Sequence, residues 1–222
     1  MKHISILAYM AFLICIGGCG GKTNDANSSS STSSTPQSVT NKVLPISPVY
    51  QQTPEWCWAA TSQMVFTYFD LPDLNGGGDY QCGIVAAAFG PSSVCWTDCA
   101  ACVTGIGTMT NMQEQLYNYG IIANQLGISS PVLNSTILFS YLSYDQVKTE
   151  ILGNRPVVVG ISPTGFSLPN ISEHVALIVG FDERSGTPSL IVNDPFPFYL
   201  PQFGNVPDPY QYAGGTQIQA GQ

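Results

Sequence analysis

Hydrophobic and polar positions divide the chain into three consecutive regions. Residues 4–16 are almost entirely apolar, and residues 20–42 are polar and rich in Ser and Thr. From residue 43 on, apolar positions first recur at helical spacing and later gather in short β-branched runs. This order predicts one α+β domain over residues 43–222, with helices in its first half and an antiparallel β-sheet in its second.

The first half of the domain contains two stretches with helical spacing. One predicts a buried helix over about residues 56–69, with Thr53 as its cap and the residues after Thr53 in its first turn. The other predicts a helix from Thr110 to Tyr119, which Gly120 is expected to end. The first of these helices is apolar enough to lie in the core of the domain.

The second half combines one helix with several strands. Ser143 is expected to cap a helix over residues 144–152, and Gly153 to stop it. Short apolar runs predict buried strands at residues 157–161, 175–181 and 189–192. Turn-forming residues separate the last two strands, which should therefore form a hairpin.

The apolar start of the chain is too short to span a membrane, because a transmembrane helix needs about 20 residues. It predicts a signal peptide over residues 1–18. The run Ile-Gly-Gly-Cys at residues 16–19 resembles a bacterial lipoprotein signal, in which Cys19 becomes the first mature residue and carries lipid. Residues 19–42 would then be a flexible tether that holds the domain at a membrane of the cell envelope. The alternative is an ordinary signal peptide that is cut nearby, with Cys19 incidental.

The charge of the chain narrows the choice of partners. There are 6 Lys and Arg against 14 Asp and Glu, and no basic run occurs. A net charge of −8 disfavours electrostatic binding to nucleic acid or to anionic lipid. We therefore expect no nucleic-acid partner, and we expect a monomer.

Cysteines form a cluster in the first half of the domain. In an oxidising compartment, four clustered cysteines are expected to form disulfides, and any of the three possible pairings remains open. A zinc site made of cysteines is the alternative, because two of them have ligand-like spacing. The cluster comprises Cys82, Cys95, Cys99 and Cys102, which leaves Cys57 as the cysteine of the domain without a partner.

The unpaired cysteine has a candidate base elsewhere in the chain. Cys57 lies at the predicted start of the buried helix, where free N–H groups and the helix dipole stabilise a thiolate. His174 is the one histidine left once the signal is removed, and it begins a predicted strand. The simpler interpretations are a buried core thiol between tryptophans and a structural histidine. The group that orients the imidazole would come from the end of the next strand, where Asp194 and Asn193 are the candidates. These two residues point to opposite sides of that strand, so only one of them can serve.

The surroundings of both residues resemble those of the papain-like cysteine peptidases. The nucleophile segment of that family is matched by a Gln six residues before the Cys and by the run Cys-Trp-Ala-Ala that starts at Cys57. The run His-Val-Ala-Leu-Ile-Val-Gly from His174 resembles the histidine segment of the family. The likeness is closer to compact bacterial branches, among them effector peptidases of plant pathogens and the peptidase domains of bacteriocin exporters.

This resemblance implies a papain-like fold and roles for single residues. Cys57 would be the nucleophile and His174 its base, with Asp194, which precedes a proline as in the bacterial branches, as the third member of the triad. Gln51 would donate to the oxyanion hole, with Gln52 as the fallback. The implied activity is that of a cysteine-type endopeptidase that cleaves peptide or protein substrates without metal or organic cofactor.

Two other functions use the same residues. An amidase or a transglutaminase-like acyl transferase would share the Cys-His chemistry, and an inactive papain-like binding module would share the scaffold. The chain also departs from the family in two respects: the tether is too short for an inhibitory prosegment, and the cysteine cluster is unlike the exporter peptidases.

Overall fold

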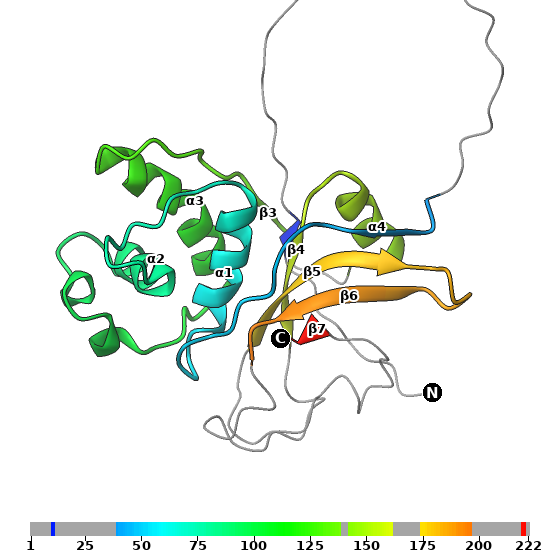
Figure 1. Ribbon diagram of the computed structural model, residues 1–222, viewed down its shortest axis with the longest axis horizontal. Coiled ribbons are helices and arrows are strands. Elements are labelled where there is room, and N and C mark those ends of the chain that lie inside the picture. Colours follow the sequence, from blue (N-terminus) through cyan, green and yellow to red (C-terminus); the bar gives the residue numbers. More distant parts are fainter. Residues whose placement is uncertain (1–9, 12–38, 139–141, 162–173, 197–218, 221–222) are drawn as a thin grey trace, which may run out of the picture.

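The computed structural model describes residues 10–11, 39–138, 142–161, 174–196 and 219–220. Two regions lie side by side in Figure 1. We call residues 44–138, which carry helices α1 to α3, the helical half. The sheet half contains β2, β4 to β7 and helix α4. The predicted α+β architecture, with helices first and an antiparallel sheet second, is confirmed.

Helix α1 (Cys57–Tyr68) matches the predicted buried helix. The predicted cap was wrong, because the helix begins at Cys57 with Trp56 at its N-cap position and no side-chain cap. The N–H of Trp56 instead donates to the carbonyl of Thr53 at 3.2 Å. That bond closes a separate turn before the helix, so the residues after Thr53 do not enter the first helical turn.

The other helices of this half surround α1. They are α2 (Tyr80–Phe89) and α3 (Met109–Gln125), and two short 3₁₀ turns, η1 (Val94–Trp96) and η2 (Cys99–Cys102), connect them. Asp79 and Thr108 cap the two helices by accepting from backbone N–H groups of the first turn. Both helices thus begin at polar residues that satisfy free N–H groups.

The predicted end of α3 was wrong, because the helix continues through Gly120 to Gln125. A Cβ atom at Gly120 would collide with the carbonyl oxygen of Pro131. The glycine therefore serves the close passage of the chain over the helix rather than its termination. A sequence pattern cannot separate these two uses of glycine, because the contact involves residues far apart in the chain.

The sheet is organised around its long central strand, β5 (His174–Asp182). On one side β5 pairs antiparallel with β6, and on the other with β4 and β2, which lie end to end along it. The partners are β2 (Asn41–Val43), β4 (Val157–Ile161) and β6 (Ser189–Asp194), with β7 (Gln219–Ala220) parallel to β6. A separate antiparallel pair joins β1 (Met10–Ala11) to β3 (Thr136–Ile137). The predicted strands and the hairpin are confirmed.

Helix α4 (Tyr144–Leu152) forms as predicted, and it lies next to the sheet (Figure 1). Ser143 forms a capping box with Gln146, and Gly153 occupies the C-cap position. Lys148 bridges from α4 to Glu183 at 2.7 Å. These contacts anchor the helix next to the central strand.

The core of the protein is continuous across both halves. Helix α1 is buried over most of its length, and its Phe66 stacks on Tyr119 of α3 with ring centroids 4.2 Å apart. On the opposite side, the hydroxyl of Thr61 donates to the carbonyl of Val175 on β5 at 3.2 Å. Helix α1 therefore fixes the helical half to the sheet half. Among the described residues, no helix combines the length and apolar character that crossing a membrane requires.

Candidate active site

Cys57 is the first residue of helix α1 and lies at the junction of the two halves. Its side chain is almost buried, with 9% exposed. Within the part of the chain that the structure describes, it is the free cysteine. The first N–H groups of a helix have no partner inside the helix, so this end of α1 presents donors and a positive dipole end beside the sulfur.

His174 is the first residue of strand β5, and strand pairing sets its position. Its Nε2 atom lies 2.7 Å from Oδ1 of Asp194, the last residue of β6. The thiol of Cys57 lies close enough to the imidazole of His174 to contribute to raising its pKa. Because Nε2 is bound to Asp194, Nδ1 is the nitrogen that is left to face the thiol.

The protonation of His174 follows from its neighbours. Burial alone lowers the pKa of His174, because a buried cation loses its hydration. The negative charge and hydrogen bond of Asp194, together with a hydrogen bond to Cys57 and its charge, outweigh burial and raise the pKa to about 10. The imidazole is therefore a cation at neutral pH, held between a sulfur and a carboxylate.

The register of strand β6 decides between the two residues that the sequence left open. Asp194 is fully buried and accepts from His174 and, through Oδ1, from the N–H of Phe196 at 2.8 Å. Asn193 points to the other side and donates to the carbonyl of Ile46 at 2.9 Å. Successive residues of a strand face opposite sides, so only Asp194 reaches the imidazole.

Phe196 is a site residue that sequence reasoning missed. Its ring meets the His174 ring edge to face, with centroids 6.1 Å apart, and its side chain is 6% exposed. It therefore shields the pair formed by His174 and Asp194 from water, which strengthens their interaction. An aromatic residue directly after Asp194-Pro195 was the available signal, but nothing local to the sequence shows that it folds back onto the histidine.

The tryptophans beside Cys57 fasten the start of α1 to the cysteine cluster. Nε1 of Trp56 donates to the carbonyl of Cys102 at 3.3 Å, and Nε1 of Trp58 donates to the carbonyl of Thr104 at 3.1 Å. Both side chains are nearly inaccessible to solvent. The segment after η2 is thus fixed against the residues that flank the nucleophile candidate.

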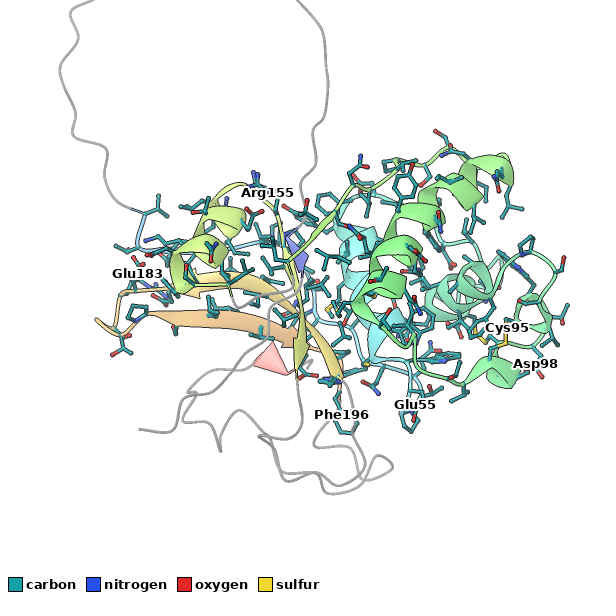
Figure 2. The ribbon with its side chains drawn as sticks, turned by 180° about the vertical axis from the view of Figure 1, so that it is seen from behind. Glu55, Cys95, Asp98, Arg155, Glu183 and Phe196 are labelled. Carbon is teal, nitrogen blue, oxygen red and sulfur yellow. A yellow bond between two sulfur atoms is a disulfide. The ribbon has the colours of Figure 1, made fainter. Side chains whose placement is uncertain are left out.

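The four clustered cysteines form two disulfides, Cys82–Cys99 and Cys95–Cys102. This selects one of the three pairings that the sequence left open. Asp79 lies close to Cys82 and Cys99 in a group with metal-ligand atom types, but the two sulfurs are bonded to each other. The first bridge joins α2 to η2, and the second joins η1 to η2 (Figure 2 labels Cys95).

Gln51 lies near the site, but its amide is already engaged. The residue is 2% exposed, and its Nε2 donates to the carbonyls of Thr53 and Pro54, both at 2.9 Å. Its Oε1 is buried without a hydrogen-bond partner among the described residues. A role as oxyanion donor therefore requires one of the two N–H bonds to be exchanged.

Gln52, the fallback, is directed toward helix α2. Its Nε2 donates to Oδ1 of Asp79 at 3.0 Å, and its backbone N–H donates to Gln81 at 3.1 Å. The structure therefore places Gln51 rather than Gln52 in the buried turn before Cys57. Cys19 and residues 19–38 of the expected tether lie outside the described residues.

A cysteine at the start of a buried helix, facing a histidine on an antiparallel sheet, defines the class of papain-like cysteine peptidases. Comparison with protein families agrees, because the model of the Peptidase_C39 like family matches residues 43–202. The chain belongs to this family, as the resemblance predicted. Comparisons with curated proteins and with solved structures found no match.

Proposed function

We propose that this chain is an exported, lipid-anchored cysteine endopeptidase that uses Cys57, His174 and Asp194 as its triad. The observation that carries the proposal is the hydrogen bond between His174 and Asp194 at 2.7 Å, with the thiol of Cys57 close enough to the same imidazole to contribute to raising its pKa. Membership in a cysteine peptidase family supports the reaction class. A thiolate–imidazolium pair whose imidazole is oriented by a carboxylate is the resting state that such chemistry needs.

In this mechanism the thiolate of Cys57 attacks the carbonyl carbon of a peptide bond. His174 gives the proton on Nδ1 to the leaving amine, and an acyl-enzyme thioester remains. His174 then takes a proton from a water molecule, whose oxygen attacks the thioester carbonyl carbon. The C–S bond breaks, the acid product leaves, and the thiolate of Cys57 and the imidazolium of His174 are restored. Asp194 keeps the imidazole oriented through Nε2 during both steps.

The developing oxyanion requires donors close to Cys57. The N–H of Cys57 is available by its position at the helix start. Gln51 could supply a second donor from the turn before the helix if one of its bonds to Thr53 or Pro54 is released. A single donor of this kind typically contributes about 3 kcal/mol to transition-state stabilisation.

The proposed location at a membrane outside the cytoplasm is supported by residues 1–19 and by the disulfides. Residues 1–18 have the composition of a signal peptide and end directly before Cys19. Two disulfides suit an oxidising compartment. Radioactive palmitate should label the full chain but not a Cys19→Ser variant, and an unlabelled full chain would reduce the proposal to soluble secretion.

The triad is tested with a thiol-directed covalent inhibitor and a peptide library. Wild-type protein should cleave a subset of peptides and be labelled at Cys57. His174→Ala should cut kcat/KM by roughly a thousandfold or more and slow labelling, because the imidazolium that supports the thiolate is lost. Lys148→Gln on α4 is the matched control and should leave both rates unchanged. Unchanged hydrolysis in Cys57→Ala would show that the nucleophile is wrongly assigned.

A further inference from the structure

The charged residues of this protein are divided unevenly between the two halves. Residues 44–138 contain acidic residues but no Lys and no Arg. The acidic residues of the helical half are Glu55, Asp70, Asp73, Asp79, Asp98 and Glu114. The region that supplies the nucleophile candidate therefore carries only negative charge.

The cations of the sheet half do not offset this charge. Three of them form local ion pairs within that half: Lys148 with Glu183 at 2.7 Å, Arg155 with Glu150 at 2.6 Å and Arg184 with Asp182 at 2.6 Å. Lys42 donates to Leu152 and Asn154, also in the sheet half. Figure 2 shows Arg155 and Glu183 on this half, away from Glu55 and Asp98.

Glu55 is the acidic residue nearest to Cys57 in the chain. Only Trp56 separates the two, so their Cα atoms lie at most about 7 Å apart. Glu55 is exposed, and its Oε2 lies 3.8 Å from the position that a Cβ on Gly105 would take. No ion pair or hydrogen bond involves its carboxylate within the described ranges.

Glu55 lies at the same edge of the molecule as the aromatic ring that packs on His174. In Figure 2, Glu55 points to the lower edge of the molecule, the edge at which Phe196 also lies, and Phe196 packs on His174. Asp98 lies farther out on the helical half in the same view. A substrate that reaches Cys57 from this edge meets, on the helical side, a carboxylate that has no partner among the described residues.

We propose that Glu55 is a specificity-determining residue that favours polypeptide substrates with Lys or Arg near the scissile bond. This inference rests on the proposed function and names its substrate class. At low ionic strength, where the Debye length is about 30 Å, a carboxylate two residues from the reacting cysteine attracts a cationic side chain and repels an anionic one. No cation of the helical half is present to weaken that selection.

The charge at Cys57 can be measured without any turnover. Two methanethiosulfonates, one with a trimethylammonium group and one with a sulfonate, modify the same thiol, and peptide mapping by mass spectrometry reads the rate at Cys57. In low salt, Glu55→Gln should lower the rate ratio of the cationic to the anionic reagent by roughly fourfold. Glu114→Gln, the matched loss of an exposed carboxylate on α3, should change it little. High salt should remove the difference, and an unchanged ratio in Glu55→Gln would overturn the inference.

Substrate preference is measured with peptides that carry Lys or Glu at each position around one cleavage site. The wild type should cleave the Lys peptides with higher kcat/KM, and Glu55→Gln should reduce that preference by a similar factor. Equal cleavage of both sets by the wild type would overturn the inference while the proposed function stands. Cleavage of no peptide would overturn the proposed function, and the reagent rates would still decide the charge preference at Cys57.

Discussion

The two halves of this protein hold their site residues in different ways. The helical half positions Cys57 through a buried helix, tryptophan side chains and two disulfides. The sheet half positions His174 and Asp194 through backbone pairing of adjacent strands. The contrast teaches that the position of Cys57 depends on side-chain and covalent contacts, whereas the positions of His174 and Asp194 depend on strand register.

Removing the disulfides should affect the helical half most strongly. Closing loops of this length is worth about 2–3 kcal/mol per bridge, because each bridge restricts the unfolded chain. Reductant should therefore lower the unfolding free energy by several kcal/mol. Hydrogen exchange should rise in α2 and the 3₁₀ turns but stay slow in β5 and β6. An equal rise in hydrogen exchange in both halves would contradict the conclusion that the disulfides hold mainly the helical half. As a control, the stability of a variant with all four clustered cysteines replaced by Ala should not change when reductant is added.

Removing the carboxylate partner should affect the sheet half in a pH-dependent way. Asp194 raises the pKa of His174 above its unfolded value, so the stabilisation is complete below pH 6.5 and is lost as pH rises toward 10. In a Cys57→Ser background, the stability difference between Asp194 and Asp194→Asn should therefore shrink from pH 6 to pH 9.5. The slope is at most about 1.4 kcal/mol per pH unit for one proton.

A surface carboxylate of the same half provides the control for this titration. Arg184 holds the pKa of Asp182 down at about 2, so its contribution is lost only in acid. The effect of Asp182→Asn should thus be constant between pH 6 and pH 9.5 in urea unfolding. A constant effect of Asp194→Asn as well would show that the imidazole is neutral in the folded protein.

Removing the hydrogen bond from Thr61 to Val175, which joins the two halves, should have the smallest effect on stability. Thr61→Val keeps the shape of the side chain but removes the donor to Val175, which should cost about 1 kcal/mol. It should also slow alkylation of Cys57, because α1 is no longer fixed against β5. Thr149→Val removes an exposed bond within α4 and should change neither quantity. Equal alkylation rates in both variants would mean that packing alone aligns the halves.

Long elements and their order could be predicted from the sequence. The helix that starts at Cys57, the capped helix after Ser143 and the hairpin from His174 were all predicted, because local periodicity and capping residues specify them. The site candidates could also be predicted, because the domain contains one cysteine outside the cluster and one histidine. The match of the family model to residues 43–202 supports a cysteine peptidase in general, and the roles of these two residues stay a prediction.

The tertiary structure decided every choice between near-equivalent residues. Strand register placed Asp194 rather than Asn193 against His174. The packing of helix α2 against the 3₁₀ turn η2 brought Cys82 next to Cys99. The close passage of Pro131 also made Gly120 a contact point inside a helix. A sequence pattern records the local preference of a residue, whereas these outcomes depend on neighbours that only the folded chain brings together.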